Sequence, residues 1–138
     1  MQITRQADYA MRAMLHLARL PENQKASTSQ IAKKEQIPPS FLAKIISQLS
    51  IAGLIHTSRG THGGVTLARP SSDISVLEII ESVDGPIAMN TCSYSKSNCF
   101  SAQGTKCPLH DIWSQSQSDL VNRLSSTSFG QLVNNNAM

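Results

Sequence analysis

The chain has few aromatic residues, few charges and no long apolar run. Of its 138 residues, 4% are aromatic and 15% are charged, whereas 40% are hydrophobic, which is enough for the core of one domain. No apolar run approaches the length of a membrane-spanning helix, and the N-terminal stretch MQITRQADYAMRAMLHLARL carries spaced polar side chains that a signal peptide lacks. We therefore expect a cytoplasmic protein without a membrane partner.

Motifs of catalysis are also missing. The sequence contains no phosphate-binding glycine loop, no recognisable nucleophile–base pair and no other pocket motif. An enzyme, including a zinc-stabilised one, is the least favoured class, and we expect no small-molecule substrate. The chain has three cysteines. Because thiols stay reduced in the cytoplasm, this odd number favours metal binding or redox chemistry over a disulfide framework.

Positive charge is concentrated in one segment. Between Lys25 and Arg69, six basic residues are opposed by Glu35 alone, a net charge of +5, whereas the whole chain carries +3. A basic block within an otherwise near-neutral protein indicates a polyanionic partner. The alternative that charge leaves open is a solvated basic face.

The spacing of apolar residues predicts a mainly α-helical fold. They recur every three or four positions from Thr4 to just before Pro21, which is typical of an amphipathic helix. A second helix is expected over residues 29–35, after the cap sequence STS, and a third from Pro39 to near Gly53. Two short helices joined by a tight turn, the second with a small polar outer face, form a helix-turn-helix.

A short hairpin is predicted directly after these helices. Two apolar runs, residues 54–57 and 65–68, flank a glycine-rich tip, so the hairpin is expected to form a wing. The third helix would enter the major groove of double-stranded DNA, and Arg59 would enter a narrow minor groove. The alternative is a purely structural helix pair. The residues expected to contact DNA are Thr28, Lys33, Ser40, Phe41, Lys44, Arg59, Gly60 and His62.

Two more helices are predicted in the second half of the chain. Ser75 and Glu78 form a capping box for a helix that runs to about Val83. A long helix begins at Pro108, and its apolar stripe must pack on the domain or on the same helix of a second chain. That stripe consists of Leu109, Ile112, Trp113, Leu120 and Leu124.

Three segments follow from these elements. Residues 1–84 are expected to be a winged helix-turn-helix domain, residues 85–107 a cysteine-rich cluster-binding loop, and residues 108–138 a dimerisation helix and tail.

All three cysteines lie in the cysteine-rich loop. Cys92, Cys99, Cys107 and His110 are spaced C-x6-C-x7-C-x2-H. Closed zinc sites usually use tighter pairs, whereas wide loops of thiolates suit an iron–sulfur cluster. The alternatives are three structural cysteines, or one reactive thiol with two bystanders, and the spacing alone favours neither side.

The sequence resembles the Rrf-two family of bacterial winged-helix regulators, which includes iron–sulfur regulators and nitric-oxide sensors. The resemblance covers nearly the whole chain: ITRQADYAMRAMLHLA, IPPSFLAKIISQLSIAGLIHTSRGTHGGVTLARP, the three-cysteine loop, and a long helix that ends with FGQLVNN. It implies a homodimer held by the long C-terminal helices and a palindromic operator. It also implies a cluster bound by Cys92, Cys99 and Cys107.

The resemblance implies two alternatives for the fourth ligand. CPLH is similar to the iron–sulfur regulators, in which the matching histidine, here His110, completes a 2Fe–2S site. ADYAMR is similar to the nitric-oxide sensors, in which the matching aspartate, here Asp8 of the partner subunit, reaches a 4Fe–4S cluster. Ala43 replaces a glutamate of the iron–sulfur regulators, and the cysteine spacings are longer, so both the DNA target preference and the cluster type stay open. A local ligand costs less ordering entropy, which favours His110.

These expectations together describe a transcriptional regulator, and we expect it to act as a repressor. Its DNA affinity would be controlled by an iron–sulfur cluster that senses redox state, nitric oxide or iron. The alternative is a cluster-free thiol-redox or partner-binding regulator on the same fold.

Overall fold

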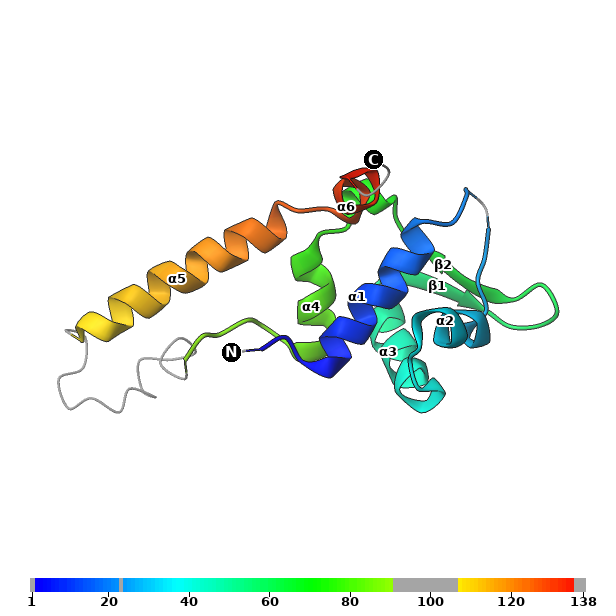
Figure 1. Cartoon of the computed structure of the whole chain (residues 1–138), viewed down its shortest axis with the longest axis horizontal. Coiled ribbons are helices and arrows are strands. Elements are labelled where there is room, and N and C mark those ends of the chain that lie inside the picture. Colours follow the sequence, from blue (N-terminus) through cyan, green and yellow to red (C-terminus); the bar gives the residue numbers. More distant parts are fainter. Residues whose placement is uncertain (1, 23, 91–106, 136–138) are drawn as a thin grey trace.

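The fold is mainly helical with one small sheet, as the sequence predicts. The computed structural model describes residues 2–22, 24–90 and 107–135. Figure 1 shows a cluster of helices with a β-hairpin at one end and a long helix projecting from the other. The elements in chain order are α1 (Arg5–Ala18), α2 (Thr28–Glu35), α3 (Pro39–Ile51), β1 (Ile55–Ser58), β2 (Gly64–Leu67), the 3-10 turn η1 (Ser71–Asp73), α4 (Val76–Asp84), α5 (Pro108–Ser125) and α6 (Phe129–Asn135).

The predicted helix-turn-helix is confirmed, and local side chains explain its boundaries. The hydroxyl of Ser27 accepts a hydrogen bond from the backbone N–H of Gln30, whose side chain bonds back to Ser27, so α2 begins with a capping box. The helix ends where Gln36 turns left-handed, at φ 54°. Pro39 then occupies the first turn of α3, where its missing N–H costs no hydrogen bond.

The wing is a two-stranded antiparallel hairpin with a third backbone segment along one edge. Ile55 pairs with Leu67 and Ser58 with Gly64, which shifts each strand by one residue from its predicted bounds. Ala26, just before α2, adds an isolated bridge to Val65, with N···O distances of 3.2 Å and 2.7 Å. The base of the wing is therefore joined to the helix-turn-helix by backbone hydrogen bonds.

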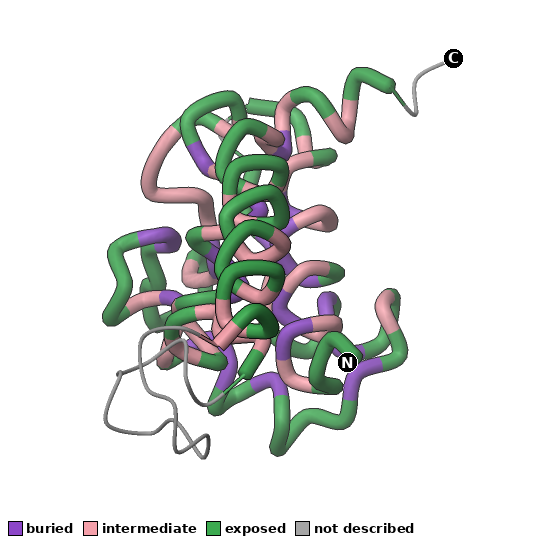
Figure 2. Tube along the Cα trace, turned by 90° about the vertical axis from the view of Figure 1, so that its left-hand side faces the viewer, coloured by how far each residue is buried: buried purple, intermediate pink, exposed green. Residues whose placement is uncertain are grey.

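One apolar core holds the winged-helix domain together. Figure 2 shows the buried positions gathered on the inner sides of the helices, while α5 carries none of them. No polar or charged residue is buried in residues 2–22, 24–90 and 107–135. Burying one Leu or Ile side chain contributes roughly 1.5–3 kcal/mol. The largest fully buried side chains are Phe129, Met14, Ile31, Leu42, Ile45, Leu49, Leu54, Ile55, Ile74, Ile79 and Val65.

The C-terminal end differs from the sequence expectation. The prediction of a single long helix that ends with FGQLVNN is wrong, because α5 ends at Ser125 and a separate helix, α6, begins at Phe129. The side chain of Thr127 donates to the carbonyl of Arg123 at 2.9 Å, which competes with continued helix. Ser128 and Gln131 then form a reciprocal pair of N-terminal hydrogen bonds.

The short helix α6 returns to the winged-helix domain. The N–H of Phe129 donates to the carbonyl of Ile74, and the N–H of Val76 donates to the carbonyl of Thr127. Phe129 is buried against the core, and Figure 1 shows α6 beside the turn that precedes α4. The C-terminal segment therefore belongs to the domain rather than to a free tail.

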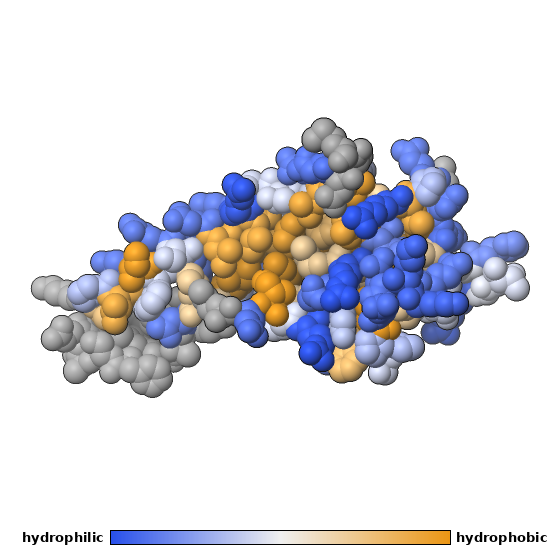
Figure 3. All heavy atoms as spheres, in the orientation of Figure 1, coloured by the Kyte–Doolittle hydropathy of each residue, from blue (hydrophilic) through white to orange (hydrophobic). Residues whose placement is uncertain are grey.

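The helix α5 leaves the domain with an apolar stripe uncovered. Leu109 is 60% exposed, Ile112 49% and Leu120 38%, whereas Leu124 packs against the core. Figure 3 shows apolar surface on α5 and on the adjoining side of the domain. None of the helices in the described ranges is both long and apolar enough to cross a membrane.

The ion pair between Arg69 and Glu78 gives stability a defined pH dependence. Burial raises the pKa of the Glu78 carboxyl. The hydrogen bonds from the backbone of Ser75 and from Arg69, together with the positive charge of Arg69, lower this pKa by more than burial raises it. The pKa of Glu78 therefore lies below its ordinary value of 4.5. A carboxyl with a lowered folded-state pKa stabilises the fold fully above its unfolded value and loses that contribution as the pH falls through the folded value.

We expect Glu78→Gln to be less stable than the wild type at neutral pH, with the difference shrinking as the pH falls below 4.5. Its size should stay under about 1 kcal/mol, because the two side chains are 39% and 42% exposed. Urea unfolding at a series of pH values measures it. A difference that does not change with pH would contradict this role for the carboxylate.

Candidate DNA interface and sensor site

The outer face of α3 is polar, small and exposed. Leu42, Ile45 and Leu49 face the core, and this packing turns Ser40 and Lys44 to the surface. The α-helix carries residues three and four apart on one side, so these exposed positions form a continuous face. The major groove of DNA admits an α-helix, so an exposed polar helix face of this kind can contact the base edges there.

A groove joins this face to the wing. It has a cavity volume of about 570 Å³ and is lined by the start of α2, the outer side of α3 and both arms of the wing. Of the residues that the sequence predicts to contact DNA, Thr28, Arg59 and Gly60 line this groove. The others do not: Lys33, Ser40, Phe41, Lys44 and His62. Ser47 and Thr57 also line it, and neither was selected from the sequence. The spacing of Ser47 from Ser40 and Lys44 was the available signal.

The tip of the wing depends on glycine. Gly60 has φ +102°, which L side chains rarely adopt, and its carbonyl accepts a hydrogen bond from the N–H of Gly63 at 3.0 Å. A Cβ atom at Gly63 would collide with the backbone carbonyl of Ser58. This tight turn leaves Arg59 and His62 exposed at the far end of the hairpin.

The basic block is less uniform than its net charge suggests. Arg69 donates to Glu78 at 2.8 Å and so is neutralised within the domain. Lys33, Lys44 and Arg59 are exposed and form no ion pair with any carboxylate in the described parts of the chain. These three cations therefore remain available for a polyanion.

Asp8 and Phe41 take part in one contact cluster around Arg12. The guanidinium of Arg12 bonds Asp8 at 2.6 Å, reaches the carbonyl of Glu35 at 3.3 Å and lies 5.6 Å from the centre of the Tyr9 ring. The Tyr9 ring packs on Phe41 with a centroid distance of 6.2 Å. Phe41 keeps 46% of its surface exposed, so it contacts α1 and still borders the reading face.

The expected sensor residues that the structure describes lie on the first turn of α5. Cys107 is the N-cap, and its carbonyl accepts the N–H of His110 at 3.1 Å. The ring Nε2 of His110 lies 3.4 Å from the hydroxyl of Ser114. Cys92 and Cys99 lie outside the described residues, and the described ones hold no cluster of three or more His, Cys, Asp or Glu side chains able to hold a metal ion.

Asp8 and the first turn of α5 lie apart within one chain. Figure 1 shows the start of α5 at the far end of the molecule from α1 and from the wing. The structure brings Cys107 and His110 together and does not bring Asp8 of the same chain to them. Ligation by Asp8 would require a second subunit, as the resemblance implies.

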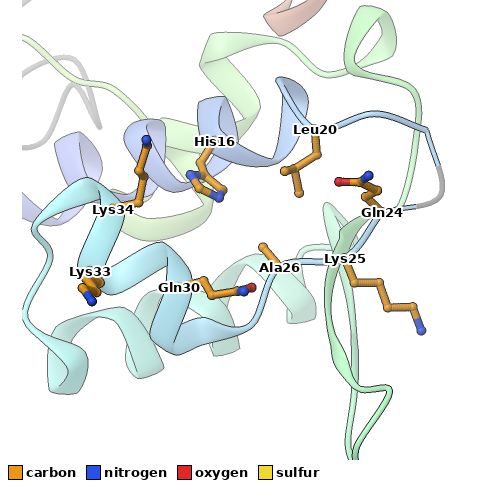
Figure 4. A pocket seen from close by; sticks show the side chains of 8 residues that line it. All are labelled: His16, Leu20, Gln24, Lys25, Ala26, Gln30, Lys33 and Lys34. Atoms are coloured by element: carbon orange, nitrogen blue, oxygen red, sulfur yellow. The ribbon is translucent and has the colours of Figure 1, made fainter.

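A second concavity of about 660 Å³ lies between α1, α2 and the segment before α2. Figure 4 shows the side chain of Gln30 below those of His16 and Leu20, with Gln24 beside Leu20 on the other side of the concavity. The Lys25 side chain points away from the other lining side chains. The polar side chains that line this concavity are basic groups and amides.

The polar reading face, the glycine-tipped wing and the unpaired cations define a winged helix-turn-helix of the DNA-binding class. The family model described as iron-dependent transcriptional regulator, Rrf2, matches residues 3–135, so the chain belongs to the Rrf2 family. The family model and the curated relatives describe transcriptional regulators, a class of DNA-binding proteins rather than enzymes.

Curated relatives agree with this assignment. The chain is 33% identical to the HTH-type transcriptional regulator IscR of Klebsiella pneumoniae over 135 residues, which cover 98% of this chain and 81% of that protein. It is 38% identical over 88 residues to an HTH-type transcriptional regulator of Mycobacterium tuberculosis. This match covers 64% of the chain and 55% of the mycobacterial protein, so the chain spans little more than half of that relative's length.

Solved structures share the fold. CymR of B. subtilis, described as the global cysteine regulator, superposes with a TM-score of 0.79 at 23% identity, covering 97% of both chains. IscR of T. potens superposes with a TM-score of 0.76 at 24% identity, covering 98% of this chain and 88% of that one. The predicted fold class is confirmed.

Proposed function

We propose that the protein is a homodimeric repressor that binds a palindromic operator and whose DNA affinity is controlled by an iron–sulfur cluster. The groove shared by α3 and the wing is the observation that carries the DNA-binding part. The residues proposed to contact DNA are Thr28, Lys33, Ser40, Phe41, Lys44, Arg59, Gly60 and His62, all of which are exposed.

Each element of the proposed interface, in the groove and beside it, has a distinct role on DNA. The α3 helix lies in the major groove, with Ser40 at its first turn and Lys44 one turn further on. Thr28 opens α2, where free backbone N–H groups suit a phosphate. Arg59 extends from the wing, and an exposed arginine at a hairpin tip suits a narrow minor groove.

We expect Arg59→Ala to weaken operator binding by about 1–3 kcal/mol if Arg59 reads a groove. Fluorescence anisotropy can measure this with a duplex that the wild type has selected from a randomised pool. Arg19→Ala is the control with the same change in charge, because Arg19 caps the C-terminus of α1 outside the groove. Equal affinity of wild type and Arg59→Ala at moderate salt, with an intact fold, would remove Arg59 from the interface.

The uncovered stripe of α5 supports a homodimer. Leu109, Ile112 and Leu120 are held by a rigid helix that leaves the domain, so they expose apolar surface that water does not favour. The same helix of a second copy offers a matching stripe across a twofold axis. Two copies would also present two reading faces to the half-sites of a palindrome.

We expect the protein to sediment as a dimer at micromolar concentration, also without a cluster. Leu120→Asp should raise the dimer dissociation constant at least about a hundredfold, because two copies of a buried leucine are each lost at roughly 1.5–3 kcal/mol. Ser118→Asp, which adds the same charge to another exposed position of α5, should remain dimeric. A wild-type monomer, or a Leu120→Asp protein as dimeric as Ser118→Asp, would refute the helix interface.

The residues available for a cluster fit such a group. Thiolate and imidazole are ligands that iron–sulfur clusters use, and Cys107 and His110 share one helical turn. Cys92 and Cys99 complete the proposed set. A bound cluster would supply chemistry that responds to oxidants, nitric oxide and iron supply. The family description as iron-dependent and the identity with K. pneumoniae IscR support this assignment.

The contacts of Asp8 favour His110 as the fourth ligand. Asp8 is engaged by Arg12 at 2.6 Å, so ligation by Asp8 would first break that ion pair. Among the described residues, the side chain of His110 has a 3.4 Å contact from its Nε2 to the hydroxyl of Ser114. Ligation by His110 therefore disturbs less of the structure. Within this proposal, residues 1–84 read DNA, residues 85–107 hold the cluster, and residues 108–138 join two copies, with α6 returning to the first segment.

We expect each of Cys92→Ala, Cys99→Ala and Cys107→Ala to lose most of the visible iron–sulfur absorbance after anaerobic reconstitution, while the dimer persists. His110→Ala should lose or shift the spectrum, and Asp8→Ala and the control His56→Ala should keep it. The reverse result for His110 and Asp8 would assign the fourth ligand to the partner subunit. Cysteine variants that all keep the wild-type spectrum, or a wild type that binds only zinc, would refute the cluster and support the cluster-free thiol-redox regulator.

A further inference from the structure

The segment before α2 runs alongside the wing as a third backbone strand. Ala26 and Val65 exchange two backbone hydrogen bonds, so the base of the wing is fixed to the domain. Lys25 precedes this bridge, and Figure 4 shows its side chain pointing away from the neighbouring cavity. Lys25 is therefore placed to act on the wing beyond the bridge.

The Lys25 ammonium meets both arms of the wing tip. Its Nζ lies 3.4 Å from the hydroxyl of Ser58, on the outgoing arm, and 3.5 Å from the carbonyl oxygen of His62, on the returning arm. No ion pair of Lys25 with a carboxylate occurs in residues 2–22, 24–90 and 107–135, so these two oxygens are its polar partners there.

The backbone of the wing makes room for this contact. A Cβ atom at Gly64 would lie 3.0 Å from the Cβ of Lys25 and 3.1 Å from the carbonyl oxygen of Ala26. A side chain at Gly64 would force the 25–26 segment to move away from the hairpin by a few tenths of an ångström. Two features thus show that the 25–26 segment lies close to the hairpin: Gly64 has no side chain, and the Lys25 side chain reaches the wing tip.

The wing tip needs such a support. Strand pairing ends at Ser58 and Gly64, and the five residues between them are held among themselves by one backbone hydrogen bond, from Gly63 to Gly60. Glycine raises the entropy lost when a turn is ordered. A side chain that bonds both arms reduces the number of conformations open to the tip before DNA arrives.

We propose that Lys25 is a positioning residue for DNA binding: its ammonium holds the two arms of the wing tip and so sets where Arg59 and His62 stand. This inference rests on the proposed function, because the wing must contact DNA for its position to matter. Lys25 acts through the wing and not as a phosphate contact of its own. Lys25→Met keeps the apolar stem of the side chain and removes the ammonium, so it tests this role directly.

We expect Lys25→Met to bind the selected duplex roughly three- to tenfold more weakly, the effect of losing two long hydrogen bonds from a charged group. Lys34→Met is the matched control, since Lys34 is an exposed lysine of α2 without a wing contact. Lys25→Arg should recover most of the affinity. Amide hydrogen exchange without DNA should speed up in residues 58–64 of Lys25→Met and stay at the wild-type rate there in Lys34→Met.

Two further measurements separate positioning from direct contact. In an Arg59→Ala background, Lys25→Met should cost little more, because its effect passes through the wing. The slope of log affinity against log salt should change no more than in Lys34→Met. A slope that falls by about one beyond the control, with additive losses, would make Lys25 a phosphate contact and overturn the proposal.

The exchange experiment also separates this inference from the proposed function. Unchanged exchange in residues 58–64 of Lys25→Met overturns the positioning role, whether or not DNA binds. A wild type that binds neither the randomised pool nor any selected duplex refutes the proposed function and, with it, the role of Lys25 in DNA binding. Faster exchange in that case would show a support of the wing that serves something other than DNA.

Discussion

The close packing around α1 is the constraint on which the rest of the structure depends. Ala7, Ala10 and Ala13 are all 0% exposed. A helix face made of alanine lets neighbouring helices approach closely, and α1 contacts α2, α3, α4, α6 and the wing strand β2. A larger side chain on this face would separate several elements at once, since a close-packed interior has no space to receive it. The distance between α3 and the wing, and with it the width of the groove, therefore depends on α1, which packs against both α3 and β2.

The opposite side of α1 carries polar contacts that meet the DNA-reading elements. Arg12 joins Asp8 to the last carbonyl of α2, and Tyr9 joins Arg12 to Phe41 on α3. The end of α2 and the start of α3, on the two sides of the turn, are thus both connected to one exposed arginine, α3 through Tyr9. Partly exposed contacts of this kind contribute little to stability individually. Because they connect α1 to the end of α2 and the start of α3, we expect them to affect the orientation of α3 more than the stability of the fold.

Local signals in the sequence were enough for most of the fold. The capping box of Ser75 and Glu78 and the glycines of the wing each act over a few residues, and the structure contains all of them. The strand bounds moved by one residue because a run of β-branched residues does not fix its own register. The break before α6 was missed although Ser128 and Gln131 have capping-box spacing, because the apolar period continues across it.

Contacts between distant residues could not be predicted in the same way. The pairing of Arg69 with Glu78 removes one charge from the basic block, and the reach of Lys25 to Ser58 spans residues 33 apart in the chain. Both depend on how elements pack, which composition and periodicity do not determine. Of the proposed cluster ligands, the structure describes Cys107 and His110, which lie within one helical turn of each other. Cys92 and Cys99 rest on the sequence and the family.

The attachment of α5 at its C-terminal end gives the proposed sensor a mechanical route to DNA. Hydrogen bonds from Val76 to Thr127 and from Phe129 to Ile74 fasten the chain beyond α5 to the start of α4. A continuous helix of 18 residues, about 27 Å long, carries Cys107 and His110 at its other end. Since α4 packs on α1 and α3, a change in how the first turn of α5 is held would reach the reading face through packed helices rather than through loops. The sensing group can shift DNA affinity only if it binds more tightly to one arrangement of these helices than to another. The difference between these two binding free energies, at the first turn of α5, is therefore the upper limit of the coupling between sensing and DNA binding.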